Sequence, residues 1–523
     1  MLRVNQYDQH VTARLLDFFD SMTPWHRCLW TPGTVLTLKE VREASKAAQA
    51  GVISAAALRD LCARAIRLIG PDPGAGSSGQ RQLLIKSLKS DMAYRGFDYE
   101  TVRQVTQVVD ESYLQHWVTI LRDPPNRPGP ERTARCIASH LLETGFSSDF
   151  LHRWWTQRIR HKQSAQDLAE MVEEAHSLTG QRPREHDVLV AFEGIPDEES
   201  GKPQGWLDAR GVSAWLRQQT FDVSGVKQNG GMVMKVSALD AWAAVEIAAE
   251  KVDHLASRVA IGTNGQLSTT RKAWVAGQRQ PFLLRRRRRG IEIRALHREN
   301  QLYSEGRGGI VDAAIELLAP LAASSPAPAV AGGWAAIEAL LSAPGDTERI
   351  LAADRLAVLV ACSFPRAELT LLSYKIQELG GDVANRLAIY EENKTRAQVT
   401  AEAIKTGELE TLPNESDRAA LFRMQALLRN PGRVLLDIQD HVASVFHRLY
   451  RQRNLVLHGG KTDAVGLRAS LRTAAPLVGA GMDRIAHASF VQGVGPLELA
   501  ARARINMDLL ASGGAPDVLS LLG

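Results

Sequence analysis

The spacing of apolar residues along the chain first predicts helices. Over residues 1–180 the apolar positions recur at intervals of three and four, for example at 41–69, 99–121 and 132–142. Proline- and glycine-rich stretches at 71–78 and 123–130 interrupt this pattern and separate the predicted helices. We therefore expect residues 1–180 to form a helical region, whose role the pattern leaves open.

The apolar spacing changes near residue 186. V-L-V-A-F (188–192) and M-V-M-K-V (232–236) are short runs bounded by turn-forming residues, which is typical of strands. Residues 273–276 and 290–295 are further strand candidates, and helical patterns cover 212–219 and 239–259. These features predict a small α+β domain over residues 181–321.

The stretch A-A-S-S-P-A-P-A-V-A-G-G (322–333) has the composition of a linker. Helical spacing resumes after it, which predicts an all-α bundle over residues 334–523. The fold class is therefore expected to be mainly α. The predicted helices of the bundle are 334–341, 348–363, 367–390, 394–405, 417–428, 434–457, 467–488 and 496–510.

Composition narrows the class of protein. The chain has 523 residues, enough for several domains, with 45% hydrophobic and 23% charged residues. Its longest apolar run, 356–364, is shorter than the ~18 residues that a membrane span needs, so we expect a buried helix and no membrane association. Charges near the N-terminus argue against an export signal.

Cysteine placement points to the cytoplasm and away from metal. The four cysteines are far apart and form no C-x-x-C pair, which disfavours both a zinc site and a disulfide framework. We expect no metal site and no cofactor. These cysteines are Cys28, Cys62, Cys136 and Cys362.

Two stretches of the sequence have features that occur in phosphate-binding sites. G-A-G-S-S-G (74–79) matches a dinucleotide-binding string, but a helix precedes it where that fold needs a strand, so a loop is favoured. A basic segment at 271–298 contains five adjacent arginines, which stay solvated unless a polyanion neutralises them. Nucleic-acid contact and a charged loop or edge strand are the two interpretations. The five are Arg285, Arg286, Arg287, Arg288 and Arg289.

The stretch Y-R-Q-R-N-L-V-L-H-G-G (450–460) ends a long amphipathic helix. Two glycines follow His458 and suit a left-handed helix end, where nearby cations favour the helix dipole. Asn454 and His458 are four residues apart and share a helix face. Arginine–histidine spacing alone carries no weight, because Arg135 and His140 repeat it in the same chain.

This stretch resembles the R-(N/H/D)-x-x-x-H motif of the HEPN superfamily, an all-α nucleic-acid-binding fold that includes many RNases. W-A-A-I-E-A-L-L (334–341) and D-R-L-A-V-L-V-A (354–361) are similar to the first two helices of its defence-associated branch. The resemblance covers about residues 330–515 and says nothing of the first 320.

The resemblance implies metal-independent RNA cleavage by a cytoplasmic phage-defence or toxin-like effector. It assigns Arg453, Asn454 and His458 to catalysis, and Glu338 matches a recurring acid that would hold one of the arginines, with a structural ion pair as an equal alternative. Arg451 is kept as a supporting residue because helical period favours it. The resemblance also implies a homodimer with a composite active site, with RNA and a regulatory partner as binding partners. The alternatives are a non-catalytic HEPN nucleic-acid-binding or scaffold protein and, less favoured, a DNA-directed enzyme acting through the middle domain.

Helix geometry leaves one point open. On an ideal helix Arg453 and His458 are about 140° apart, whereas Arg451 and His458 differ by only about 20°. Helical period therefore favours Arg451, whereas the family pattern favours Arg453. We also expect the first 320 residues to sense a trigger or restrain the nuclease, so that removing residues before 322 would release activity.

Overall fold

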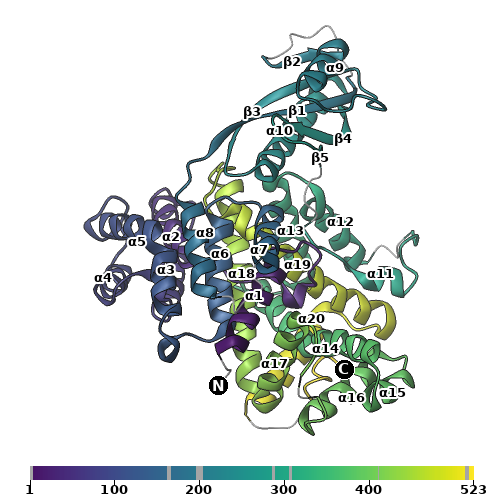
Figure 1. Ribbon diagram of the computed structural model, residues 1–523. Coiled ribbons are helices and arrows are strands. Elements are labelled where there is room, and N and C mark those ends of the chain that lie inside the picture. The colour runs from purple at the N-terminus through teal and green to yellow at the C-terminus, as the bar shows by residue number, and fades with distance from the viewer. Residues whose placement is uncertain are drawn as a thin grey trace.

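The computed structural model describes residues 4–161, 167–195, 204–284, 289–305, 309–409, 411–512 and 517–523. Over these residues the chain is mainly helical and carries one antiparallel sheet. Figure 1 shows the sheet and its helices at the top, above a large helical body. The expected fold class, mainly α with a small α+β unit in the middle, is confirmed at this level.

The N-terminal region is helical, as predicted. The helix expected over 41–69 is instead two helices, because Gly51 lies in the left-handed region (φ +72°) and Ser54 caps the next helix by accepting from the Ala57 N–H. The G-A-G-S-S-G string forms a loop and a helix start. The helices are α1 (Val4–Phe19), η1 (Trp25–Arg27), α2 (Thr34–Gln49), α3 (Ala55–Ile69), η2 (Pro73–Ala75), α4 (Ser78–Leu88), α5 (Phe97–Leu121), η3 (Pro124–Asn126), α6 (Pro130–Glu143), α7 (Ser148–His161) and α8 (Leu168–Thr179).

The sheet explains the uninterrupted apolar run at 188–192. Val188 and Val190 pack under one helix of this unit, while Leu189 and Ala191 pack under the other, so both faces of the strand are buried. The strand order is β2-β3-β1-β4-β5. The elements are β1 (Arg184–Gly194), β2 (Trp206–Asp208), α9 (Ala209–Gln218), β3 (Gly230–Ala238), α10 (Ala241–Thr263), β4 (Ser268–Val275) and β5 (Phe282–Leu283).

The predicted linker at 322–333 is wrong, because these residues belong to a tight helical hairpin. At Gly332 a Cβ would lie 2.6 Å from the Leu317 carbonyl oxygen, so the small residues serve close packing of two helices. The strand predicted at 290–295 is also wrong, since that segment leads into a short helix. The helices here are α11 (Arg294–Arg298), α12 (Ile310–Ala323) and α13 (Pro326–Leu341).

The C-terminal third is a helical bundle around one long helix. Predicted helices 348–363 and 367–390 are largely one helix, which continues through Pro365 and is followed by a short one. The elements are α14 (Leu351–Leu379), α15 (Asp382–Ala388), α16 (Asn393–Lys405), α17 (Glu415–Arg429), α18 (Pro431–Leu457), α19 (Leu467–His487), the π-helix η4 (Ala488–Gln492) and α20 (Pro496–Ala511).

Helix α14 lies in the centre of this bundle. Among the residues described, it is the one helix long and apolar enough to cross a membrane by length and composition. Its most apolar window is 78% buried within the protein, as in the core helix of a globular fold. The expected buried helix at 356–364 is part of α14, and Leu356, Leu359 and Val360 are buried there.

The largest hydrophobic core joins the two ends of the chain. It contains Leu38, Leu61 and Leu84 from α2, α3 and α4 together with Trp334 and Leu359 from α13 and α14. Residues of α11 and α12 also belong to it. The helical body therefore includes α11 and α12, which we expected in the α+β domain, and a fragment beginning at 322 would expose this core to water.

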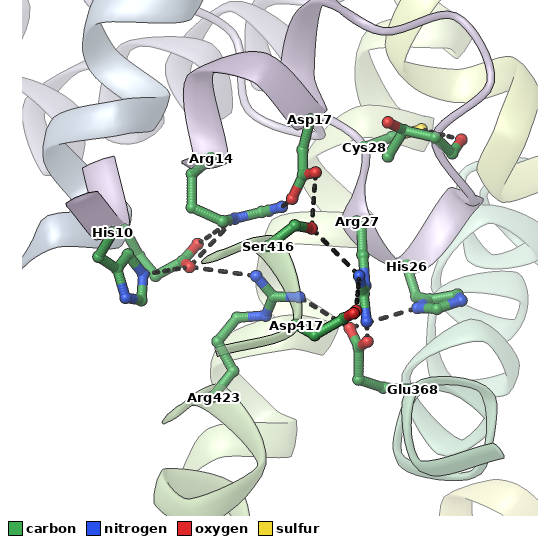
Figure 2. A network of polar contacts seen from close by, with 12 residues as sticks. His10, Arg14, Asp17, His26, Arg27, Cys28, Glu368, Ser416, Asp417 and Arg423 are labelled. Carbon is green, nitrogen blue, oxygen red and sulfur yellow. Dashed lines mark hydrogen bonds and ion pairs between the residues drawn. The ribbon is translucent and has the colours of Figure 1, made fainter. Parts of the chain in front are cut away.

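A buried network of charges also connects the N-terminal and C-terminal helices (Figure 2). Glu368 on α14 is fully buried, with Arg27 Nε 2.8 Å from its Oε1 and Arg423 Nη2 2.7 Å from its Oε2. The other guanidinium nitrogen of Arg423 lies 3.1 Å from Glu131 on α6. Arg423 thus joins two carboxylates from distant parts of the chain.

The same network reaches α1 through Glu131. His10 Nε2 and Arg14 Nε lie 2.9 and 3.1 Å from its Oε1. Burial alone would raise the pKa of Glu131 and of Glu368, but adjacent basic side chains hold both pKa values well below the ordinary range: Arg14 and Arg423 at Glu131, and His26, Arg423 and Arg27 at Glu368. Both carboxylates are therefore ionised inside the protein.

Replacing Glu368 with glutamine tests this network. The variant leaves Arg27 and Arg423 without their shared counter-charge, so the free energy of unfolding should fall by about 3 to 5 kcal/mol. Urea denaturation followed by tryptophan fluorescence measures it. Glu378→Gln is the control, because that side chain is 63% exposed and its ion pair within the described part of the chain is with Lys375, one turn earlier. Equal urea midpoints for the two variants would contradict the role of the network.

The network also predicts a dependence of stability on pH. Because both carboxylates have lower pKa values in the folded state, the unfolded chain takes up protons first as pH falls. Their contribution is complete above pH ~5 and declines below it, by up to about 1.4 kcal/mol per pH unit for each proton. The urea midpoint, measured from pH 7 to pH 4, should fall less steeply in Glu368→Gln than in the unchanged protein. Parallel curves would contradict this.

Candidate functional site

The C-terminal end of α18 carries the residues singled out in the sequence. The Asn430 side chain accepts from the Arg433 N–H and Pro431 occupies the first turn, which starts the helix. At its other end the last turn widens, with the Gly459 N–H donating to the Asn454 carbonyl over 3.3 Å. Gly460 follows with φ +61°, so the expected left-handed end is confirmed.

Arg453 and His458 meet at this helix end. Arg453 Nη1 lies 2.8 Å from His458 Nε2, even though an ideal helix would separate the two residues by about 140°. The length of the arginine side chain and the position of His458 at the helix cap allow the contact. Since a guanidinium only donates, Nε2 accepts and carries no proton in this arrangement. His458 is exposed and Arg453 half-buried.

Asn454 supports the arginine rather than the histidine. Its side-chain Oδ1 accepts from Arg453 Nη1 over 3.0 Å, and its backbone carbonyl accepts from the His458 N–H over 3.0 Å. The sequence suggested that this amide would orient the imidazole ring. In the structure it orients the guanidinium, which in turn contacts the ring.

Arg451 lies on the opposite, buried side of α18. Burial lowers its pKa to about 10, although the negative charge of Glu40 partly offsets this effect. Its position follows from helical spacing, because Arg448, three residues earlier, is buried on the same side. Of the two arginines, it is Arg453 that contacts His458.

The buried side of α18 is held by α2. Arg448 Nη2 lies 2.7 Å from Glu40 Oε2, and both side chains are only 3% exposed. Glu43, one turn further along α2, pairs with Lys461 and accepts from the Val465 N–H over 3.2 Å. Glu40 and Glu43 were not singled out from the sequence. The feature that could have identified them is their spacing: two acidic residues three positions apart, on one otherwise apolar face of a helix.

Glu338 forms a structural ion pair, which was one of the two roles expected for it. It lies on α13, where its Oε1 is 3.5 Å from Arg349 Nη1. Helix α13 still packs beside α18, since the Trp334 and Tyr450 rings are 4.7 Å apart. Glu338 therefore pairs with Arg349 rather than with an arginine of the motif.

Of the five adjacent arginines, the structure describes the last one, which contacts the helical body. Arg285, Arg286, Arg287 and Arg288 lie outside the residues that the structure describes. Arg289 donates to the carbonyl oxygens of Leu321 and Ser324, each over 2.9 Å. These carbonyls are at the C-terminal end of α12, where a cation is favourable. At least this arginine has a structural use beside any contact with nucleic acid.

Comparisons of the chain with protein-family models, with curated proteins and with solved structures found no match. In the described ranges, no group of three or more His, Cys, Asp or Glu side chains converges as a metal-binding set would. The chemistry of the site has to be derived from Arg453, Asn454 and His458 themselves.

The two sides of α18 should respond differently to substitution. Arg448→Met leaves Glu40 buried without its main counter-charge and should lower the free energy of unfolding by about 3 to 5 kcal/mol. Arg453→Met removes a partly exposed side chain whose contacts stay within one helix end, so a change under about 0.5 kcal/mol is expected. Urea denaturation of both variants checks this. A loss of similar size in Arg453→Met would mean that this arginine is structural.

Proposed function

We propose that the chain is a metal-independent endoribonuclease of HEPN type, with Arg453, Asn454 and His458 as its active-site residues. The observation that carries the proposal is the 2.8 Å contact between Arg453 and His458 at an accessible helix end. In this reaction the ribose 2′-oxygen bonds to the adjacent phosphorus and the bond to the 5′-oxygen breaks. The products are a cyclic phosphate and a 5′-OH end.

Each residue has a chemical role in this proposal. His458, with Nε2 unprotonated, accepts the proton of the 2′-OH, and the imidazolium so formed is the group able to protonate the leaving 5′-oxygen. Arg453 binds the phosphate through its two N–H arms and stabilises the charge that develops on it. An incoming phosphate competes with His458 for Arg453, which frees Nε2 for the proton. Asn454 keeps the guanidinium in place.

A second copy of the chain would complete the site. Two apolar side chains beside the motif, Leu457 and Val465, are 50% and 47% exposed. Burying them between two chains would stabilise a homodimer and bring two Arg453–His458 pairs together. A cytoplasmic defence or toxin-like role, and a regulatory partner, remain part of the proposal through the family resemblance.

RNA cleavage by the whole chain tests the proposal. Purified protein should cleave single-stranded RNA in EDTA, and the new ends should be cyclic phosphate and 5′-OH. His458→Ala should lower the rate by about 10²- to 10⁴-fold, the range for loss of a general acid–base. Arg453→Ala should lower it by about 10²- to 10³-fold through loss of charge stabilisation. The rate per chain should rise with protein concentration if two chains form the site.

Matched variants separate catalysis from folding. His254→Ala and Arg433→Ala remove an exposed histidine on α10 and an exposed arginine at the start of α18, and both should cleave normally. RNA binding without cleavage, unchanged by His458→Ala, would instead support a nucleic-acid-binding or scaffold protein. Cleavage that needs added metal would contradict the proposal.

The proposed restraint by the N-terminal helices needs a test in the full chain, because a fragment from 322 would expose the shared core. The contacts through which α2 could restrain the site are made by Glu43, which pairs with Lys461 and accepts from the Val465 N–H. Both partners are close to His458 in sequence. If α2 restrains the site, Glu43→Gln should cleave RNA faster than the unchanged chain. An unchanged or lower rate would count against restraint through this contact.

A further inference from the structure

A cationic cleft lies among α14, α19, η4, α20 and the C-terminal segment 517–523. The empty space in it, counted together with the open solvent at its mouth, is about 480 Å³. Its polar lining includes Arg366 from α14 with Arg484 and His487 from α19, and its apolar lining includes Leu499, Leu519 and Leu522. None of these residues belongs to the proposed RNA-cleaving site.

Arg366 has no hydrogen bond or ion pair with any other described residue, although its side chain is half-buried. Burial lowers its pKa, and the negative charge of Glu392 only partly opposes this. A guanidinium taken partly out of water without a partner carries an unfavourable desolvation free energy. An anion in the cleft would supply the missing partner.

Other cations converge on the same place. Burial also lowers the pKa of Arg484, and the positive charges of Arg366 and Arg298 contribute to that shift despite the adjacent Asp483. Arg298 Nη2 lies 3.2 Å from His487 Nδ1, which is also 3.0 Å from Glu299. The acids of this region are already engaged: Glu299 pairs with Arg298 and His487, and Asp483 accepts from the Ala295 N–H and lies 3.3 Å from Arg484 Nη2.

We propose that this cleft binds a small phosphate monoester, with Arg366 and Arg484 on the phosphate and Leu522 against its apolar part. Arginine suits a phosphate because its planar N–H groups match two phosphate oxygens at once. A phosphate dianion would pair with Arg366 and share Arg484 with Asp483, which lies 3.3 Å from it. Leu522 is the partly exposed leucine of this lining, whereas Leu499 and Leu519 are already buried in the core.

Binding of two probes to the full chain tests this assignment. Inorganic phosphate and phenyl phosphate are titrated by calorimetry, with chloride exchanged so that ionic strength is constant. Both should bind saturably, and phenyl phosphate more tightly because its ring covers Leu522. Arg366→Gln and Arg484→Gln should each weaken binding by about 10- to 100-fold, the range for a lost charged hydrogen bond. Arg386→Gln, an exposed arginine paired with Glu408, is the control and should bind normally.

The melting temperature of the unliganded variants distinguishes a ligand site from a structural one. If Arg366 serves a ligand, Arg366→Gln relieves repulsion between cations and melts no lower than the unchanged protein. A lower melting temperature with binding retained would overturn the proposal, as would the absence of saturable binding by either probe. Displacement of phenyl phosphate by a short single-stranded RNA would assign the cleft to nucleic acid instead.

Discussion

The helical body depends on charges that are buried far from water and neutralised only by residues distant in sequence. Glu368 is fully buried, and its partner Arg27 is 341 residues away. Arg423 gives one side of its guanidinium to Glu368 and the other to Glu131. An ionised carboxylate in this position is tolerable only when α1, η1, α6, α14 and α17 are all in place. The network therefore makes the first and last thirds of the chain one structure.

This constraint also shapes the candidate site. Helix α2 packs on α18 through the ion pair of Glu40 with Arg448, so one side of α18 is buried and serves the fold. Arg453 and His458 lie on the side that remains accessible. The arginines of a single stretch, R-L-Y-R-Q-R, thus have different uses, which follow from the face of the helix on which each lies.

Arginine has several distinct uses in this protein, and its neighbours decide between them. Arg423 and Arg448 meet buried carboxylates and stabilise the fold. Arg289 meets carbonyl oxygens at a helix end. Arg453 contacts the imidazole of His458 rather than a carboxylate, and Arg366 contacts no described partner. Within the described ranges neither arginine forms an ion pair with an acid side chain, and in the two sites that we propose both bind phosphate groups. Residue type alone does not distinguish these cases.

Local patterns were enough to predict most of the elements. Apolar spacing located α5, α6, α17 and α18 closely, the two apolar runs located β1 and β3, and Gly459–Gly460 marked the end of α18. These features depend on residues within a few positions of each other, so the sequence carries them directly. The motif residues Arg453, Asn454 and His458 were likewise visible in the sequence.

Tertiary structure decided what depends on distant neighbours. The composition of 322–333 is that of a linker, and only the packing against α12 shows another use for its small residues. Gly332 is needed there because the Leu317 backbone of α12 approaches it closely. The choice between Arg451 and Arg453 depended on α2, whose Glu40 and Glu43 lie some 400 residues earlier and hold the other side of α18. Sequence determined which segments would be helix or strand, since that is set by local spacing and caps. The fold decided which side chains are buried and paired, since desolvation and charge pairing act between residues that only folding brings together.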